Sequence, residues 1–425
     1  MSILKNIIPM VIVKWLKSEI KKYPCLIHFI NLILSFIKYL PHISFKYVDS
    51  KYELVRYEDG KNETFFGYYD KSPKNETGEY ILYYSTSHPT KKKPDPNRPI
   101  NLIVFDCINN VIVKRFLIYA YNWQQGSKVQ WIEKYRFIFN NYDLVKKRYC
   151  SELYDVQTNI STFVDYPVYD VCNNKALSLN FNRLAILRPD YGYFNVAMSK
   201  EELEDISDDG VYIVDLERNS CTLLLSIERL LQTFPIRYDI EEVTAHKVNH
   251  IMFSPDGERF IFLHRFFING KKIDRFFLYE FESQKITLLS DNDMVSHYSW
   301  IDNKRIIVYM RRFGIGDLYY VIDLYPVKIT PVQNTELQSF GDGHPTVKNG
   351  LLVTDSYPDS SCTQYLLLYD FFTNKNLCLG TFHHSLLYSR EMRCDLHPKW
   401  TFNGEEIFFD SIYNRGRHLY SLKLS

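Results

Sequence analysis

The sequence predicts an all-β fold, a seven-bladed β-propeller, on three observations. Aromatic residues make up 16% of the chain, with 34 Tyr and 29 Phe, and such residues favour pleated, half-buried strands. One pattern recurs: a strand, a turn with Pro, Asn, Asp or Gly, then a strand of aromatic and β-branched residues. Its instances are mostly about 40 to 57 residues apart, close to the roughly 40 to 50 residues of a propeller blade. They are residues 68–85, 129–141, 169–181, 251–265, 298–312, 345–356 and 397–411.

A second pair of strands with a polar turn lies between most of these instances. The pairs are residues 102–116, 210–227, 275–290 and 365–380. A β-sandwich also has short strands with regular turns, but alternating inner and outer hairpins favour the propeller. The long interval between Asn174 and Asp256 contains a charged segment, residues 183–210. We expect this segment to be a loop over one face, because long loops in compact folds are commonly functional lids.

The chain divides into an N-terminal amphipathic helical extension, residues 1–45, and the propeller, residues 46–425. Pro9 and several lysines interrupt the apolar runs of the extension, which stay shorter than the roughly 18 residues of a membrane-spanning helix. No small-residue cleavage site of a signal peptide follows them. We therefore expect a cytoplasmic protein. Its first 45 residues either lie on the inner membrane surface or pack on the propeller rim.

Charge and motifs exclude several functions. Lys plus Arg (51) nearly equal Asp plus Glu (50), so the chain lacks the basic field that binds nucleic acid. The sequence contains neither a GxSxG elbow nor a P-loop, which disfavours serine hydrolysis and nucleotide hydrolysis.

Histidines stand just before the repeated turn in four successive units. They are His250, His297, His344 and His397, and Asp395 accompanies the last. The inner strands of a propeller end at its central channel, so these side chains are expected to converge there. Imidazole and carboxylate together suit first-row divalent ions, which makes His344, Asp395 and His397 candidate metal ligands. The alternative is that each histidine only bonds to nearby backbone and closes its hairpin.

Other residues near the channel are candidates for contact with a substrate. Arg393 can pair bidentately with a carboxylate, and His250 lies at the same level. The dense Trp and Gln patch of residues 121–132 places Trp123 and Gln125 at a blade entrance, where they would stack on and hydrogen-bond a sugar. The alternative is a packed core tryptophan with turn amides.

At these residues the sequence resembles the oligogalacturonate lyases, seven-bladed propellers that cleave uronide disaccharides by metal-assisted β-elimination. The resemblance covers roughly the C-terminal two-thirds of the chain. The segment from Asp395 to Pro398 matches the metal-binding HPHP motif of that family, and His344 matches a further ligand. The resemblance also implies that His297 is the catalytic base and that Arg275 contacts the substrate.

The chain departs from this family at two ligands. Asp395 stands where the family has a histidine, and the glutamine ligand has no counterpart, because Glu391 and Met392 occupy that neighbourhood. The chain is also similar to TolB-like propellers of bacterial surface-polysaccharide gene clusters. The phrases that carry this similarity are GYYDKSP, NWQQG, LNFNRL and RCDLHPKW.

Together these features favour a polysaccharide lyase that uses a divalent metal, with Mn²⁺ preferred, on a uronic-acid-containing oligosaccharide or polysaccharide. A non-catalytic glycan-binding or scaffolding propeller is the alternative. Some TolB-like relatives are labelled glycosyltransferases, but the sequence has neither a Rossmann-like domain nor a DxD motif in a βα setting.

Overall fold

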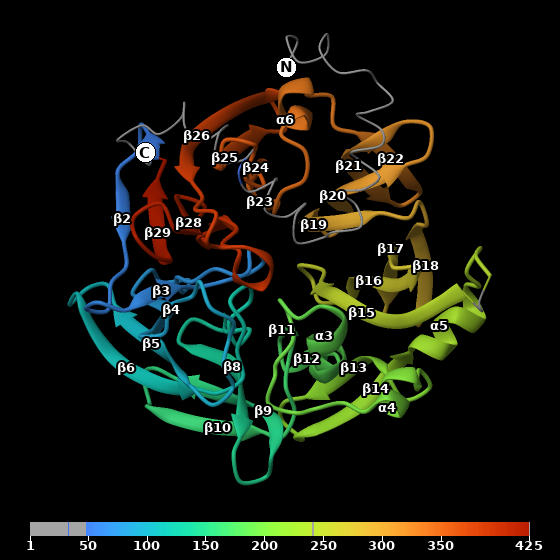
Figure 1. Cartoon of the computed structure of the whole chain (residues 1–425), viewed down its shortest axis with the longest axis horizontal. Helices are drawn as coiled ribbons and strands as arrows, with labels where there is room; N and C mark the ends of the chain where they lie inside the picture. Colours follow the sequence, from blue (N-terminus) through green and yellow to red (C-terminus); the bar gives the residue numbers. More distant parts are fainter. Residues whose placement is uncertain (1–32, 34–47, 240–241, 425) are drawn as a thin grey trace.

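The computed structural model describes residues 33, 48–239 and 242–424, and seven sheets form a ring around a central axis (Figure 1). The ring confirms the predicted seven-bladed propeller. The predicted extension, residues 1–45, lies outside the described residues apart from Ile33. No helix among the described residues is long and apolar enough to cross a membrane.

Blades one to five each use four consecutive antiparallel strands, numbered from the axis outward. Blade one contains β3 (Glu63–Phe65), β4 (Tyr80–Thr86), β5 (Ile100–Asp106) and β6 (Val111–Ile118). Blade two contains β7 (Gln130–Trp131), β8 (Arg136–Asp143), β9 (Arg148–Asp155) and β10 (Ile160–Val164). Blade three contains β11 (Asp170–Cys172), β12 (Lys175–Ser178), β13 (Gly210–Asp215) and β14 (Ser220–Ser226). Blade four contains β15 (Val243–Phe253), β16 (Arg259–Ile268), β17 (Lys271–Glu280) and β18 (Lys285–Ser290). Blade five contains β19 (Val295–Asp302), β20 (Arg305–Arg312), β21 (Gly316–Leu324) and β22 (Val327–Pro331).

The ring closes through strands from the beginning of the described propeller. Blade six contains β23 (Thr346–Lys348), β24 (Leu351–Asp355), β25 (Thr363–Asp370) and β26 (Lys375–His383), and β1 (Val48–Ser50) adds a fifth strand outside β26. Blade seven contains β27 (Lys399–Trp400), β28 (Glu406–Ser411) and β29 (His418–Lys423), and β2 (Leu54–Arg56) supplies its outermost strand. Backbone hydrogen bonds between the two ends of the propeller therefore close the ring.

The predicted repeats fall on the inner hairpins of the blades, with one difference in blade one. There β3 ends at Phe65, and the chain leaves the strand before it returns to pair with β4 at Lys74. Gly67 permits this excursion: its φ is +100°, and a Cβ would lie 3.0 Å from the backbone carbon of Gln125. The excursion carries Tyr68 and Tyr69 to the axis.

Aromatic side chains fill the space between neighbouring blades. Phe116 of blade one lies 5.1 Å from Phe139 and 4.8 Å from Tyr154 of blade two, measured between ring centroids. Such pairs contribute about 0.5–1.5 kcal/mol each beyond the area they bury. Aromatic side chains therefore supply packing between neighbouring blades, which accounts for the high aromatic content.

Short helices interrupt the strand pattern. They are α3 (Phe181–Leu187), α4 (Lys200–Glu204), α5 (Ile227–Thr233), α6 (Thr335–Ser339) and the 3₁₀ helix η4 (Arg390–Met392). The predicted loop of residues 183–210 contains most of α3 and all of α4, inserted between β12 and β13. The side chain of Asn180 caps α3. Arg183 is buried and bonds to Asp209 and to the carbonyls of Leu203 and Asp205. This insertion is therefore packed structure, and α3 lies on the inner side of blade three (Figure 1).

Candidate functional site

The four histidines predicted from the repeats converge at the axis. The ring centroids of His297 and His344 are 4.1 Å apart, and those of His344 and His397 are 4.2 Å apart. His250 lies 5.6 Å from His297. All four side chains are buried. The structure thus brings together residues that are almost 150 positions apart in the sequence.

His344, Asp395 and His397 offer ligand atoms that lie within 4.8 Å of one another. Metal–ligand bonds of about 2.0–2.2 Å span at most about 4.4 Å across an ion, so shifts of a few tenths of an ångström would complete the set. The Nε2 atoms of His344 and His397 are buried and have no hydrogen-bond partner among the described residues. An unpaired buried nitrogen costs about 1–3 kcal/mol. A divalent ion between these atoms would remove that cost, so the residues fit a metal.

Asp355 orients two of these residues. Its carboxylate is 2.8 Å from Nδ1 of His344 and accepts the backbone N–H groups of His344 (2.8 Å) and His397 (3.0 Å). Burial lowers the pKa of His344, but the carboxylates of Asp355, Asp395 and Asp342 together outweigh burial and the pKa is raised. The raised pKa favours a proton on Nε2 as well, which an ion would have to displace, while Asp355 holds the proton on Nδ1. Asp355 was not predicted from the sequence, where its only signal is its place at the end of a repeated hairpin.

Asp395 and His397 are held in the protonation states that a metal requires. Arg393 forms a bidentate pair with Asp395, with Nε–Oδ1 2.6 Å and Nη2–Oδ2 2.7 Å. Burial raises the pKa of Asp395, but Arg393 holds it well below the usual range. Burial keeps the pKa of His397 well below its ordinary value. The site therefore presents a carboxylate and a neutral imidazole, both competent ligands.

His397 and His250 share an unusual backbone conformation. Their φ angles are +46° and +53°, in the left-handed region where side chains other than glycine cost of order 1 kcal/mol or more. His397 lies just before β27, and His250 lies within β15 where the register with β16 shifts. Strain of this kind clusters at functional sites, and here it turns both imidazoles toward the axis.

His297 has the surroundings of a proton acceptor. Its Nδ1 lies 3.3 Å from Oδ1 of Asp342 and 3.1 Å from Oγ of Ser296. Burial, and then the neighbouring His344, lowers the pKa of His297 well below its ordinary value. Burial also raises the pKa of Asp342 to about 6. A neutral imidazole oriented by a second group is the arrangement that general bases use.

Tyrosines form the wall around the histidines. Tyr68 bonds to Nδ1 of His250, and its ring lies 5.2 Å from that of His397. Tyr69 lies 5.4 Å from His344. Tyr191, from the blade-three insertion, lies 5.3 Å from His250. Tyr68 and Tyr69 belong to the phrase GYYDKSP, whose only signal in the sequence is its similarity to TolB-like propellers.

Arg275 does not meet His297, contrary to the role implied by the resemblance. It pairs in register with His264 and donates to the carbonyl of Phe234 at 2.8 Å. Successive strand residues point to opposite faces. The face toward the channel carries the preceding residue, Asp274, beside Arg265. Arg275, which matches the substrate-contacting arginine of the family, thus lies on the side of β17 that faces away from the channel.

Trp123 and Gln125 are also placed away from any substrate. The Trp123 ring is 1% exposed, lies 5.6 Å from Phe65, and donates from Nε1 to the carbonyl of Lys92 at 2.7 Å. Gln125 is buried and donates to the hydroxyl of Tyr169. Neither side chain offers a free face to a sugar. Trp123 and Gln125 therefore fit the alternative of a packed core tryptophan with turn amides.

Arg393 and His250 stay candidates for substrate contact. The Arg393 side chain is 26% exposed, and its guanidinium lies 4.8 Å above the ring of Tyr357. His250 is bound to Tyr68, and its carbonyl accepts the hydroxyl of Tyr298. A substrate role for these two residues remains a prediction.

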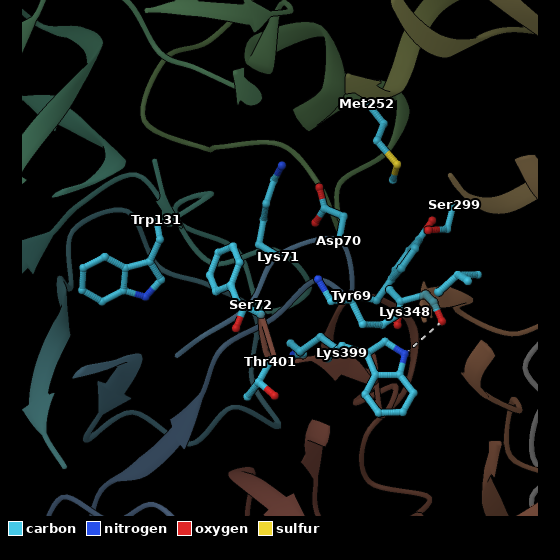
Figure 2. Close-up of a pocket in the computed structure, with 14 residues that line it drawn as sticks. Tyr69, Asp70, Lys71, Ser72, Trp131, Met252, Ser299, Lys348, Lys399 and Thr401 are labelled. Atoms are coloured by element: carbon cyan, nitrogen blue, oxygen red, sulfur yellow. Dashed lines mark hydrogen bonds between the residues drawn. The ribbon is translucent and has the colours of Figure 1, made fainter. Parts of the chain in front are cut away.

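A cavity of about 290 Å³ opens elsewhere on the channel and shares Tyr69 with the histidine cluster (Figure 2). Lys71 and Lys399 line it together with Asp70. Lys71 pairs with Asp170, and Lys399 donates to the carbonyl of Gly67 at 2.8 Å. None of the residues predicted from the sequence to bind metal or substrate lines this cavity.

Known proteins resemble this chain in structure but not detectably in sequence. Neither protein-family models nor curated protein sequences match the chain. The structure is similar to that of an oligogalacturonate lyase from Vibrio parahaemolyticus, with 12% identity, a TM-score of 0.58, and coverage of 89% of this chain and 96% of that one. It is also similar to the β-propeller domain of the Trilobed protease from Pyrococcus furiosus, with 10% identity, a TM-score of 0.50, and coverage of 89% and 95%. An acylaminoacyl peptidase matches with 11% identity, a TM-score of 0.51, and coverage of 85% and 52%. At such identities the likeness shows the fold alone, because one propeller serves many chemistries.

Proposed function

We propose that this protein is a metal-assisted polysaccharide lyase that performs β-elimination on a uronic-acid-containing oligosaccharide. The observation that carries the proposal is the pair of unpartnered Nε2 atoms on His344 and His397 beside the ionised Asp395. The neutral ring of His297 lies 4.1 Å from that of His344. A proton acceptor and a candidate ion site therefore lie in one buried cluster of side chains. The structural similarity to a protein described as an oligogalacturonate lyase agrees with this chemistry.

His344, Asp395 and His397 would hold the ion. Their carboxylate suits Mn²⁺, the ion we propose, whereas their two imidazoles also suit Zn²⁺ and Fe²⁺. When bound, a divalent ion supplies Lewis-acid stabilisation of the substrate carboxylate and acidifies the adjacent C–H bond. Arg393 keeps Asp395 ionised, and Asp355 keeps His344 turned toward the ion.

His297 would remove the proton from the ring carbon next to the carboxylate. The electron pair of the broken C–H bond forms a C=C bond, and the glycosidic C–O bond breaks. The leaving oxygen then takes a proton from solvent. Asp342 holds Nδ1 of His297, so Nε2 is the atom that accepts the proton. No covalent nucleophile is needed, which agrees with the lack of hydrolase motifs in the sequence.

The test combines metal analysis of the purified protein with ultraviolet absorbance of unsaturated uronate during incubation with uronide oligosaccharides. His297→Ala is expected to abolish product formation and leave metal content unchanged. His88→Ala is the matched control, because it makes the same change at a partly exposed histidine outside the cluster. A protein without metal and without unsaturated product, or an active His297→Ala variant, would contradict the proposal.

A non-catalytic glycan-binding propeller is the second candidate, and one observation favours it. Both carboxylate oxygens of Asp395 already bond to Arg393, which is how a closed polar network without metal would look. Metal analysis separates the two candidates. A glycosyltransferase is disfavoured, because the seven sheets of the described residues are all antiparallel blades and none is the parallel sheet of a nucleotide-sugar domain.

A further inference from the structure

One tyrosine beside the histidines has a free hydroxyl. The ring of Tyr357 lies 5.7 Å from that of His344 and 6.5 Å from that of His297, measured between centroids. Tyr357 is half-buried, and its hydroxyl makes no hydrogen bond among the described residues and reaches solvent. A donor that no protein group uses therefore borders both the proposed base and a proposed metal ligand.

The other tyrosines around the histidines already bind protein groups through their hydroxyls. The pairs are Tyr68 with His250, Tyr69 with the carbonyl of Tyr298, Tyr298 with the carbonyl of His250, and Tyr191 with Arg188. A tyrosine carries one hydroxyl proton, so a hydroxyl that donates within the protein loses that bond when it serves a ligand. Tyr357 has no such bond to lose.

The chain fixes where Tyr357 lies. It stands two residues after Asp355, the last residue of β24, and the following Pro358 restricts its backbone to extended conformations. Ser356 donates its N–H to the carbonyl of Tyr365 at 3.0 Å, and its Oγ accepts the N–H of Tyr365 at 3.1 Å. The tyrosine therefore extends from a hydrogen-bonded strand end, the same end that carries Asp355.

A cation lies over the ring of Tyr357. The guanidinium of Arg393 is 4.8 Å from the ring centroid, and its bidentate pair with Asp395 holds it there. A tyrosine hydroxyl, with an ordinary pKa of about 10, carries its proton near neutral pH. A phenol that gives up its proton becomes an anion, which a neighbouring cation stabilises. Tyr357 thus combines an available proton with a neighbour that stabilises the charge left behind.

We propose that Tyr357 is the general acid of the elimination and delivers the proton to the leaving glycosidic oxygen. This inference rests on the proposed lyase function and adds the residue through which the solvent proton reaches the substrate. His297 takes the C–H proton, the electron pair forms the C=C bond, and the C–O bond breaks as the Tyr357 O–H proton moves to the oxygen. The Tyr357 phenolate then takes a proton from solvent, and His297 releases its own to solvent. Base and acid act on neighbouring carbons of one sugar ring, which agrees with two side chains that both border His344.

The test compares kcat of the metal-loaded protein on two probes with different leaving groups: digalacturonate, and galacturonate with a nitrophenyl group on the same oxygen. Tyr357→Phe keeps the ring and removes the hydroxyl. Its kcat on digalacturonate is expected to fall about 100-fold, a typical contribution of a general acid. On the nitrophenyl probe kcat is expected to fall less than about threefold, because nitrophenolate leaves without a proton.

Tyr365→Phe is the matched control. It removes a hydroxyl at the far end of the connection that carries Tyr357, where the Tyr365 ring packs on Phe340 and the hydroxyl bonds to Asp359 at 3.2 Å. Its kcat on both probes is expected to stay within about twofold of the wild type. Thermal unfolding and calorimetric titration with digalacturonate check that both variants fold and bind the disaccharide.

The outcomes separate this inference from the proposed function. A loss confined to digalacturonate supports Tyr357 as the acid. An unchanged kcat on digalacturonate overturns this role and leaves the lyase standing, since solvent then supplies the proton directly. An equal loss on both probes also overturns it and assigns the hydroxyl to substrate positioning. A wild type that forms unsaturated product from neither probe contradicts the lyase function, and the acid with it.

Discussion

The histidine cluster and the lysine-lined cavity both lie on one propeller channel and share Tyr69, yet they satisfy their polar groups differently. At the cavity, Lys71 pairs with Asp170, Lys128 lies 3.3 Å from Asp70, and Nζ of Lys399 lies 3.8 Å from Asp410. At the histidine cluster, two imidazole nitrogens have no partner. Paired charges stabilise a fold, whereas unpaired buried groups call for an explanation such as a bound ligand. At the cavity, Oδ1 of Asp70 is the one buried lining side-chain atom of the described residues without a hydrogen-bond partner. The difference indicates a structural role at the cavity and a binding role at the histidines.

The largest expected effect is on stability, at the cavity. Asp410→Asn removes the charge opposite Lys399 and one of the acceptors for the backbone N–H groups of Phe66 and Gly67. Breaking a buried ion pair costs about 3–5 kcal/mol, and we expect that loss in urea unfolding. Metal content per folded molecule should not change. If Asp410→Asn lost metal but kept its stability, the two regions would not be separate in role.

The second effect is a gain in stability at Lys247 that depends on pH. Lys247 has a pKa of 10.5 when exposed and about 6 in the folded protein, so it must lose its proton on folding. This cost is absent above pH 10.5, grows as the pH falls, and is complete below about pH 6. Lys247→Met is therefore expected to be about 1–4 kcal/mol more stable than the wild type near pH 7. The gain should disappear as the pH rises toward 10.5.

Chemical unfolding between pH 6 and 10 measures that gain. Arg265, Arg188, Lys272 and Asp274 face the amine and are all kept in the variant. Lys272, whose pKa is lowered to about 8, titrates within this range in both proteins. A gain that did not depend on pH would show that packing, not charge, limits the wild type at this position.

The smallest of the three effects is on metal affinity. Asp355→Asn keeps the shape of the side chain but weakens the bond that orients His344. Loss of such an outer partner lowers metal affinity about 10- to 100-fold, which competition with a chelator would measure. Asp342→Asn is the matched control, because Asp342 contacts His297. It should lower turnover and leave metal affinity unchanged. Equal metal affinity of the two variants would contradict the metal centre at His344.

Much of the fold could be predicted because it is encoded locally. Each inner hairpin carries its own turn residues and aromatic strands, so the repeat is visible without any tertiary information. The excursion that brings Tyr68 and Tyr69 to the axis was not predicted. It depends on Gly67 packing against the backbone of Gln125 and on Asp410, 343 residues away, accepting the N–H of Gly67.

The candidate site was only partly predictable. Its histidines were found because they recur at equivalent positions in the repeat. Arg275, which the resemblance matches to a substrate-contacting arginine, lies on the opposite face of β17 from Asp274, because side chains alternate along a strand. Trp123 was read as a possible sugar platform because residue type does not reveal burial. No sequence pattern marks Asp355 and Asp342. Their roles follow only from their contacts with His344 and His297.

The sequence alone determined the class of fold, the number of blades and the convergence of His250, His297, His344 and His397, because all of these follow from periodicity. The tertiary structure alone decided which atoms are left without partners. It showed that Asp355 turns His344, that Arg393 keeps Asp395 charged, and that Asp274 pairs with both Arg265 and Lys272. The physical reason is that pairing of buried charges depends on distances between blades, and no local pattern records those distances.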